Sequence, residues 1–324
     1  MHLVQSMAYV NEIPWHGLGN KLAAKQPLEV WAKSAGMDWK IEESEVRFVA
    51  SSADNRAGLG AIHAFPEQKV LYRSDTRAPL SVVSSRYQVV QPNEILEFYR
   101  DLTEIGGMEL ETAGVLKDGK KLWALARTGQ SATLKGKDQV NGYLLLATAC
   151  DGTLATTAQH TSVRVVCNNT LSIALGDSNG AVKVGHRSQF DAQAVKRQLG
   201  IAISSWDGFM VRMKALSERK VNDDDAEKFF QRVLTYPTSG PSIPAPSTND
   251  RAIKAAQALY AGRGKGATLP SASGTAWGLV NSITEFVDHQ RRARSDDHRR
   301  DAAWFGAGAT LKQKAWDEAM KLVA

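Results

Sequence analysis

The stretch YLLLATACDGTLATTAQHTSVRVVCNNTLSIAL, residues 143–175, carries the densest structural signal in this chain of 324 residues. Residues 143–149 are mostly apolar, and residues 153–159 are rich in β-branched side chains, which suit a pleated surface. Asp151 and Gly152 stand between these runs, and an Asp-Gly pair is typical of a two-residue type I′ turn. The stretch therefore predicts a β-hairpin whose register is set by that turn.

After position 162 the spacing of the apolar residues changes from that of a strand to that of a helix. The residues at helical spacing are Val163, Val166, Cys167, Thr170, Leu171 and Ala174. The other face of this predicted helix, over residues 162–175, carries Arg164, Asn168 and Asn169, which are strong hydrogen-bond donors. We expect a ligand site there. The alternative is that Arg164 pairs with a carboxylate while the two Asn side chains bind loop backbone.

Length and composition restrict the class of protein. A chain of this length with 43% hydrophobic residues can form one large or two moderate domains. No apolar run reaches the roughly 18 residues of a membrane span, and the first residues lack a signal-peptide pattern, so we expect a cytoplasmic protein without membrane association. Cys150 and Cys167 both lie in apolar stretches, which favours buried, reduced thiols over a disulfide scaffold.

The net charge of +6 lies entirely in the second half of the chain. Residues 1–150 contain 17 Lys and Arg against 17 Asp and Glu, whereas residues 151–324 contain 23 against 17. A polyanionic partner would therefore meet the second half first. The alternative is an ordinary solvated surface, because many basic proteins bind no polyanion.

Alternating apolar and polar residues over 39–91 predict strands, with turns at residues 53–55 and 66–67. Asn93 is expected to cap a helix that ends near residue 105. A second hairpin is expected to turn at residues 117–120. The apolar stripe beyond Ser188 predicts a long helix up to about residue 220, and a second helix follows it. A later helix, over residues 275–290, should turn inward Trp277, Val280, Ile283, Thr284 and Val287.

These elements predict an α+β fold, in which a curved antiparallel sheet with packed helices is followed by a mostly helical C-terminal part. The expected segments are an N-terminal loop and helix (1–38), a core of antiparallel sheet with helices (39–187), a helical hairpin (188–235), a proline-rich linker (236–248) and a helical C-terminal region (249–324).

Arginine and aromatic residues are concentrated late in the chain. Residues 291–300 contain five arginines and are followed by Trp304 and Phe305. Basic residues beside exposed aromatic side chains bind the phosphates and stack on the bases of a single strand. The alternative is that the arginines are solvated or pair with Asp296, Asp297 and Asp301, while the aromatic residues pack the C-terminal helix.

Each candidate motif for catalysis, a cofactor or a metal is explained at least as well by a purely structural role. We therefore expect no catalytic residue, no cofactor and no metal. The glycine-basic loop of residues 262–266 lacks the preceding strand and the Ser or Thr of a phosphate-binding P-loop. Cys150, His160 and Cys167 lack the spacing of a zinc site. His16 has no neighbouring ligand type in its loop, which favours a structural or interface role.

Six segments carry a resemblance to a known family. They are PWHGLG (14–19), SSRYQVVQ (84–91), TAGVLKDGKKLWALA (112–126), HTSVRVVCNNTL (160–171), TAWGLVNSITEFVDH (275–289) and FGAGATLK (305–312). They resemble the phage/plasmid-like protein family, the domain of unknown function with the number 932, over essentially the whole chain. The resemblance implies a setting of mobile DNA and brings no established activity, cofactor or catalytic residue.

The expected architecture is also similar to that of the single-strand annealing proteins of the Red-beta type, without a shared motif. This similarity implies a homo-oligomer that neutralises the phosphates of single-stranded DNA and breaks no bond. Together with the C-terminal arginines, it predicts nucleic-acid binding by Arg86, Lys120, Lys121, Arg127, Arg164, Asn168, Asn169, Arg291, Arg292 and Trp304.

The leading hypothesis is a DNA-binding protein of a mobile genetic element that binds or anneals single-stranded DNA, as in recombination. One alternative is an enzyme, a hydrolase or a nucleotide-modifying protein, with a cleft near Arg164, Asn168 and His160. The other is a protein-binding module that acts on host defence or replication.

Overall fold

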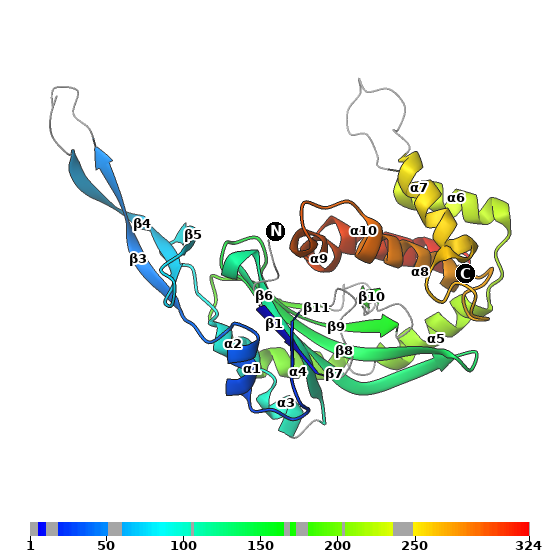
Figure 1. Cartoon of the computed structure of the whole chain (residues 1–324), viewed down its shortest axis with the longest axis horizontal. Coiled ribbons are helices and arrows are strands. Elements are labelled where there is room, and N and C mark those ends of the chain that lie inside the picture. Colours follow the sequence, from blue (N-terminus) through cyan, green and yellow to red (C-terminus); the bar gives the residue numbers. More distant parts are fainter. Residues whose placement is uncertain are drawn as a thin grey trace. The chain divides into compact units, whose positions relative to one another are not determined.

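The structure, a computed structural model, describes residues 6–10, 19–50, 60–104, 107–164, 169–172, 181–202, 205–235 and 249–323. Within these ranges the chain contains a large, mostly antiparallel sheet, a three-stranded sheet, and helices that dominate the C-terminal part (Figure 1). The α+β fold class predicted from the sequence is thereby confirmed. Among the described residues, no helix combines the length and the apolar composition that crossing a membrane requires.

The large sheet has the strand order β10-β9-β8-β7-β6-β1-β2, and β11 also pairs with β9. Its strands are β1 (Ser6–Tyr9), β2 (Asn20–Lys21), β6 (Glu109–Leu116), β7 (Lys121–Leu134), β8 (Asp138–Ala149), β9 (Thr156–Arg164), β10 (Asn169–Ser172) and β11 (Ala181–Val184). The pairs β1–β6 and β9–β10 are antiparallel, whereas β1 and β2 run parallel. Short turns join β6 to β7 and β7 to β8, and neighbouring strands so joined pair antiparallel.

The hairpin β6–β7 turns where the sequence predicted, through the short helical turn η1 (Lys117–Gly119). Asp118 has a φ of 59° and Gly119 a φ of 105°. A Cβ at Gly119 would lie 3.1 Å from the Leu80 side chain and 3.2 Å from the Trp39 ring. Glycine is required here both by the backbone conformation and by the close packing.

The central stretch contains the predicted hairpin, because β8 and β9 are neighbours in the sheet. Residues 150–155 connect them, so the two-residue Asp-Gly turn was wrong. In this longer loop Asp151 accepts hydrogen bonds from the backbone N–H and the hydroxyl of Thr153, at 3.0 and 2.6 Å. The loop is therefore closed by a side chain rather than by turn geometry.

The helix predicted over residues 162–175 was wrong in its described part. Strand β9 continues to Arg164, and β10 pairs back onto it with Asn169 opposite Arg164. The valines and threonines of this stretch fit a pleated surface as well as a helix face. Pairing of β9 with β10 favours the strand over the helix. The spacing of apolar residues along one segment does not reveal such pairing.

The three-stranded sheet has β4 in the middle. Its strands are β3 (Ile41–Ala50), β4 (Ala61–Arg73) and β5 (Pro79–Ser84). The turn predicted at residues 66–67 was wrong, since β4 runs through it as one strand. The register instead passes from Glu45 opposite Lys69 to Val46 opposite Phe65, which leaves a bulge in β4. Proline is tolerated there because a bulge needs no ladder hydrogen bond from it.

Besides η1, the helices and helical turns lie mostly in the second half of the described chain. They are α1 (Leu28–Ser34), α2 (Pro92–Glu97), α3 (Arg100–Glu104), α4 (Ala192–Ala202), α5 (Ser205–Glu218), α6 (Asp223–Leu234), α7 (Asp250–Ala258), η2 (Leu259–Arg263), α8 (Ala276–Glu285), η3 (Phe286–Gln290), α9 (Asp296–Phe305) and α10 (Ala307–Met320). The single long helix predicted beyond Ser188 is described as two helices, α4 and α5. The turn predicted at residues 53–55 and the proline-rich linker, 236–248, lie outside the described residues.

The cap of α2 is Gln91, so the prediction of Asn93 was wrong. The backbone N–H of Gln91 donates to the Glu94 carboxylate at 2.6 Å. The Gln91 side chain binds both backbone groups of Ile41, accepting from N at 2.9 Å and donating to O at 3.0 Å. Gln91 thus joins the start of α2 to the start of β3. The sequence pattern of a helix cap does not predict this long-range contact.

Two compact units divide the chain. Unit 1 comprises Met1–Ala126, Leu145–Ala158 and Val182–Arg197, and unit 2 comprises Arg127–Leu144, Gln159–Ala181 and Gln198–Ala324. Strands β7, β8 and β9 each contribute residues to both units. The segment boundaries expected from the sequence stay predictions.

Unit 1 has an aromatic core with hydrogen-bonded hydroxyl groups. The Tyr99 hydroxyl donates to the Ala124 carbonyl at 2.8 Å, and the Tyr87 hydroxyl donates to the Ala149 carbonyl at 2.7 Å. His186 stacks on Tyr87 with ring centroids 4.4 Å apart. Buried tyrosines require such partners, and these bonds join the helices and loops of unit 1 to the sheet.

Unit 2 is organised around α8, every residue of which is buried. The helix packs against α5, α7 and α10. A helix without a solvent face must be surrounded by other elements, which explains why most of its residues are apolar or small. The residues predicted to face inward are all buried: Trp277, Val280, Ile283, Thr284 and Val287.

A buried carboxylate joins α8 to the sheet within unit 2. Asp138, at the start of β8, is fully buried and accepts hydrogen bonds from the Ser271 hydroxyl at 2.6 Å and the Trp277 indole at 3.1 Å. The Thr275 hydroxyl caps α8 by accepting from the backbone N–H of Gly278 at 3.1 Å. Residues 249–323 therefore pack on strands of their own chain.

Candidate functional site

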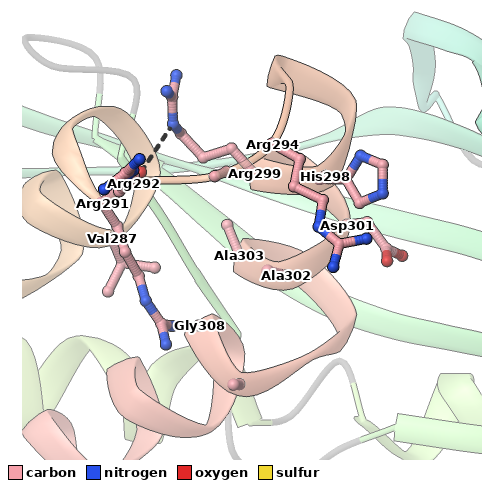
Figure 2. Close-up of a pocket in the computed structure, with 12 residues that line it drawn as sticks. Val287, Arg291, Arg292, Arg294, His298, Arg299, Asp301, Ala302, Ala303 and Gly308 are labelled. Carbon is pink, nitrogen blue, oxygen red and sulfur yellow. Dashed lines mark hydrogen bonds between the residues drawn. The ribbon is translucent and has the colours of Figure 1, made fainter.

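A pocket of about 310 Å³ lies in unit 2, where η3 leads into α9 (Figure 2). Figure 2 shows arginines on two sides of it, with small apolar residues of α9 and α10 between them. The charged residues that line the pocket are Arg291, Arg292, Arg294, His298, Arg299 and Asp301. Guanidinium groups outnumber carboxylates in this lining, so the pocket favours an anion.

Hydrogen bonds fix one of these arginines in place. Arg299 donates from Nε to the Arg291 carbonyl at 3.1 Å and from Nη1 to the Asp296 carboxylate at 2.8 Å. Ser295 caps α9 by accepting from the backbone N–H of His298 at 3.3 Å, and its hydroxyl also lies 2.9 Å from His298 Nδ1. The polar wall of the pocket is therefore held by the first turn of α9.

The alternative considered from the sequence was that these arginines are solvated or pair with neighbouring aspartates, and Arg299 and Arg300 form such pairs. Arg299 pairs with Asp296 at 2.8 Å, and Arg300 lies 3.8 Å from Asp297. Arg292 and Arg294 are exposed, and within the described part of the chain neither makes a hydrogen bond or an ion pair. These two guanidinium groups are open to a ligand.

Arg300 is a buried charge on the same helix. Its side chain is 5% exposed, and Nε, Nη1 and Nη2 have no hydrogen-bond partner among the described residues. Burial lowers the pKa of this guanidinium, while Asp297 and Asp296 oppose that shift. An unsatisfied buried cation is costly, and its field partly offsets that of the three aspartates of α9.

The N-terminus of α10 completes the pocket. Ala307 and Gly308 line it, and no side chain caps the helix. An uncapped helix N-terminus presents backbone N–H groups and a partial positive charge to an anion. A Cβ at Gly308 would lie 2.7 Å from the Ala302 carbonyl oxygen and 2.9 Å from Val287 Cγ1. Glycine thus lets α10 begin this close to α9.

Sequence reasoning identified the arginines of this site but not His298, Ala307 or Gly308. Only the run of small residues before the last helix, without a Ser, Asp or Asn cap, signalled an open helix N-terminus. Of the residues predicted to bind nucleic acid, Arg291 and Arg292 line the pocket together. Trp304 is partly buried and packs against the core of unit 2.

Three predicted binding residues belong to unit 1. Arg86 is exposed in the loop after β5, and Lys120 is half-buried at the β6–β7 turn. Lys121 is only 4% exposed, so it offers a polyanion little surface.

The remaining predicted residues lie on strands of unit 2 or next to them. Arg127, half-buried on β7, has its guanidinium 5.9 Å from the centre of the Tyr143 ring and donates to the Tyr143 hydroxyl at 3.4 Å. Arg164 and Asn169 occupy opposing positions of β9 and β10. The structure thus pairs the positions of these two residues, although through a hairpin and not on a helix, and Asn168 lies outside the described residues.

Of the residues proposed for the enzyme alternative, the structure describes the side chains of His160 and Asp151. His160 is buried on β9, its Nε2 has no hydrogen-bond partner among the described residues, and burial lowers the pKa of its imidazole. Asp151 is bound to Thr153 in its own loop. His16 lies outside the described residues.

The glycine-basic loop at residues 262–266 holds a carboxylate of its own chain. The Lys265 backbone N–H donates to the buried Glu285 carboxylate, at 3.0 and 3.2 Å from its two oxygens. A Cβ at Gly264 would lie 3.0 Å from the same carboxylate. Since Glu285 supplies the anion here, this loop is part of the core of unit 2.

Cys150 is buried and free, as the sequence suggested for it. Its thiol lies 3.5 Å from the Lys120 carbonyl oxygen. Burial, reinforced by the charge of Asp151, raises the pKa of the thiol to about 12. A thiol so hard to ionise is a poor metal ligand, and Cys167 lies outside the described residues.

Comparison with known proteins gives one match. A family model described as "Domain of unknown function (DUF932)" matches residues 79–304, about 70% of the chain. No curated protein and no solved structure matches. The matched region contains the arginines of the pocket and excludes β3 and β4.

Proposed function

Since the chain belongs to the DUF932 family, a domain of unknown function, we propose its activity from the pocket itself: it binds single-stranded nucleic acid through phosphate contacts. The observation that carries this proposal is the pocket between η3, α9 and α10, in which exposed Arg292 and Arg294 meet an uncapped helix N-terminus. Both features select phosphate, one by paired N–H donors and one by the helix dipole.

The shape of the site favours a flexible strand over a duplex. A pocket of about 310 Å³ encloses a group the size of a nucleotide from more than one side. The phosphates of a duplex lie on a stiff convex surface, whereas a single strand can turn one phosphate inward and spread its bases over neighbouring surface. The pocket has no nucleophile with an adjacent base among its lining residues, and the proposed activity is therefore binding without bond breaking.

The wider setting belongs to the same proposal and rests on the sequence resemblances. It comprises a cytoplasmic protein of a mobile genetic element, annealing of DNA strands in recombination, and a homo-oligomer of the Red-beta type. The basic second half of the chain supports a polyanionic partner. The enzyme alternative, with its cleft near Arg164, Asn168 and His160, would use a different surface, because none of these is among the described residues that line the pocket.

The test is fluorescence anisotropy of a labelled single strand and of the matching duplex, titrated with the full chain over a series of salt concentrations. Each phosphate contact contributes about −0.7 to the slope of log K against log salt for a single strand. Arg292→Ala and Arg294→Ala should each weaken binding and reduce the slope by about that amount. Arg251→Ala is the matched control, because Arg251 is an exposed arginine of α7 in the same unit and does not line the pocket.

The outcomes separate the candidates. Salt-sensitive binding that prefers the single strand and is weakened in the pocket variants but not in Arg251→Ala supports the proposal. Equal losses in Arg251→Ala would mean that the charge of the whole unit binds, and the pocket assignment would then be wrong. No binding to either probe at low salt would overturn the proposed function.

A further inference from the structure

The distal part of the β3–β4 ribbon in unit 1 exposes apolar side chains that a lone two-stranded ribbon does not bury. Strand β5 pairs with β4 only from Gln68 to Tyr72, so beyond that point β3 and β4 pair with each other alone. Large apolar residues are exposed there: Phe48 by 49%, Val49 by 59%, Ile62 by 69% and Phe65 by 39%. An isolated two-stranded ribbon is only marginally stable in water. An exposed apolar surface on such a ribbon is therefore a candidate binding surface.

Strand β3 is also an open edge of its sheet. Among the described residues no strand pairs with its outer side. The backbone groups of Ile41 point away from β4, since the Gln91 side chain binds both of them. By the alternation of an antiparallel ladder, the outward backbone groups are then those of Glu43, Glu45, Arg47 and Val49. A long regular edge without proline is a template for another strand.

We propose that this edge binds β3 of a second copy of the chain, antiparallel and centred on Val46. A two-fold axis perpendicular to the sheet requires one residue to lie opposite itself, because opposing residues share a face of the sheet. Centres at Glu45 or Arg47 place like charges on the axis, and a centre at Ser44 places Glu43 opposite Glu45. A centre at Val46 places Glu45 of each copy opposite Arg47 of the other, so that both pairs attract.

The register also joins apolar surface across the axis. Val46 is paired with Phe65 across the ribbon, and Phe48 with His63, whose ring stacks on it at 5.4 Å. These side chains share one face, which Val82 of β5 extends through the pairing of Ser44 with Val70 and of Val70 with Val82. Two copies related by the axis would form one six-stranded sheet with a continuous apolar face. The charges on either side of Val46 are complementary to those of a second β3, which makes a second copy of this chain the occupant of the edge.

Charge exchange tests the register with the full chain and without nucleic acid. Glu45 and Arg47 pair with each other within the chain at 3.0 Å, and their side chains are 65% and 66% exposed. Substitutions at these positions break that surface pair and leave the core untouched. Glu45→Arg alone and Arg47→Glu alone each place like charges opposite each other and should weaken self-association about tenfold or more. An equimolar mixture of the two variants pairs opposite charges again and should associate as the original chain does. Light scattering after size exclusion measures the mass of each sample.

Cysteine pairing tests the centre. In a Cys167→Ser background the remaining native thiol, Cys150, is buried. Val46→Cys should then form an intermolecular disulfide under mild oxidation, because residues opposite each other in a strand pair have the Cα separation of a disulfide. Ser44→Cys on the same face is the control and should not form an intermolecular disulfide. With the centre at Val46, residue 44 of one copy lies four residues along the strand from residue 44 of the other.

We expect the original chain to form a dimer, each charge variant alone to be mostly monomeric, and the equimolar mixture of the two variants to form a dimer again. A chain that stays monomeric at the highest concentration reached, or charge variants that associate like the original chain, would overturn the proposal. Cross-linking at Ser44 but not at Val46 would overturn the register. Because these measurements contain no nucleic acid, their outcome does not depend on the proposed nucleic-acid binding.

Discussion

At the scale of single residues, buried ionisable groups in unit 2 determine how the stability of the fold depends on pH. His160 lies in β9, and burial lowers the pKa of its imidazole below the ordinary 6.5. The unfolded chain therefore binds a proton on this residue at a higher pH than the folded chain does. This contribution to stability is fully present above about pH 6.5 and is lost as the pH falls towards the lowered pKa.

We expect His160→Asn to remove that part of the pH dependence. The free energy of unfolding of the original chain should fall as the pH drops below about 6.5, with a slope of up to about 1.4 kcal/mol per pH unit from this residue. The variant should show a flatter profile, because asparagine does not titrate. Urea unfolding at a series of pH values measures the difference. Parallel profiles for the two proteins would contradict the assignment of His160 as a buried neutral residue.

Arg300 gives a second prediction at this scale. Its guanidinium is buried without a hydrogen-bond partner among the described residues, so its desolvation is poorly compensated. Arg300→Met keeps a similar length and removes the charge, and we expect the free energy of unfolding to stay within about 1 kcal/mol or to rise. Thermal unfolding compares the two proteins. A loss of several kcal/mol would show that the charge is needed for the fold.

The same variant bears on the pocket. If Arg300 acts only through its field on α9, nucleic-acid binding should weaken less in Arg300→Met than in Arg292→Ala, because Arg300 does not line the pocket. A stronger effect at Arg300 would place a phosphate next to it.

At the scale of secondary-structure elements, two glycines inside helices have opposite roles. Gly278 in α8 faces the carbonyl oxygen of Ala272, which a Cβ would meet in a direct clash, and the Tyr260 ring at 3.0 Å. Gly208 in α5 is exposed, and a Cβ there would meet only Arg212 Nη2, at 3.9 Å. The first glycine permits close packing, whereas the second only lowers the helix propensity of its segment.

Alanine at these two positions should therefore change stability in opposite directions. We expect Gly278→Ala to lower the free energy of unfolding by about 1–3 kcal/mol through overpacking. Gly208→Ala should raise it by up to about 1 kcal/mol through helix propensity. Denaturant unfolding of the matched pair measures both changes. If Gly278→Ala were as stable as Gly208→Ala, the close approach of residue 272 to α8 would be refuted.

At the scale of the whole molecule, the C-terminal helices are part of the core of unit 2. Phe209 of α5 stacks on Trp316 of α10 with ring centroids 5.1 Å apart. The fully buried Asp138 of β8 depends on Ser271 and Trp277 for hydrogen bonds. Unit 2 therefore combines residues from strands in the middle of the chain with helices from its end.

A chain that ends at residue 235 should consequently fail to fold as the full chain does. It would leave the Asp138 carboxylate without these partners and expose apolar side chains such as Phe209 and Phe230. We expect the truncated chain to aggregate or to lose cooperative unfolding, which circular dichroism and size exclusion would show. The full chain is the control, and a truncated chain with an unchanged melting temperature would contradict this account.

Much of the local structure could be predicted from particular residues. The Asp118-Gly119 pair marked the β6–β7 turn, and the spacing from Trp277 to Val287 identified the inward face of α8. The arginines from residue 291 onward indicated the charged wall of the pocket. These features depend on neighbours within a few residues, where backbone preference and helical or strand periodicity act.

The sequence by itself thus determined the fold class, several turns and helix faces, and the location of the positive charge. Tertiary structure decided that β9 continues to Arg164, that Gln91 binds Ile41, and that Gly308 completes the pocket. It also decided which arginines are open to a ligand, because Asp296 occupies Arg299 while Arg292 stays exposed. The physical reason is that strand pairing, burial and the approach of two helices are free energies shared between distant segments. The sequence pattern of one segment contains only the residues on its own side of such a contact, and the residues on the other side lie far away in the chain.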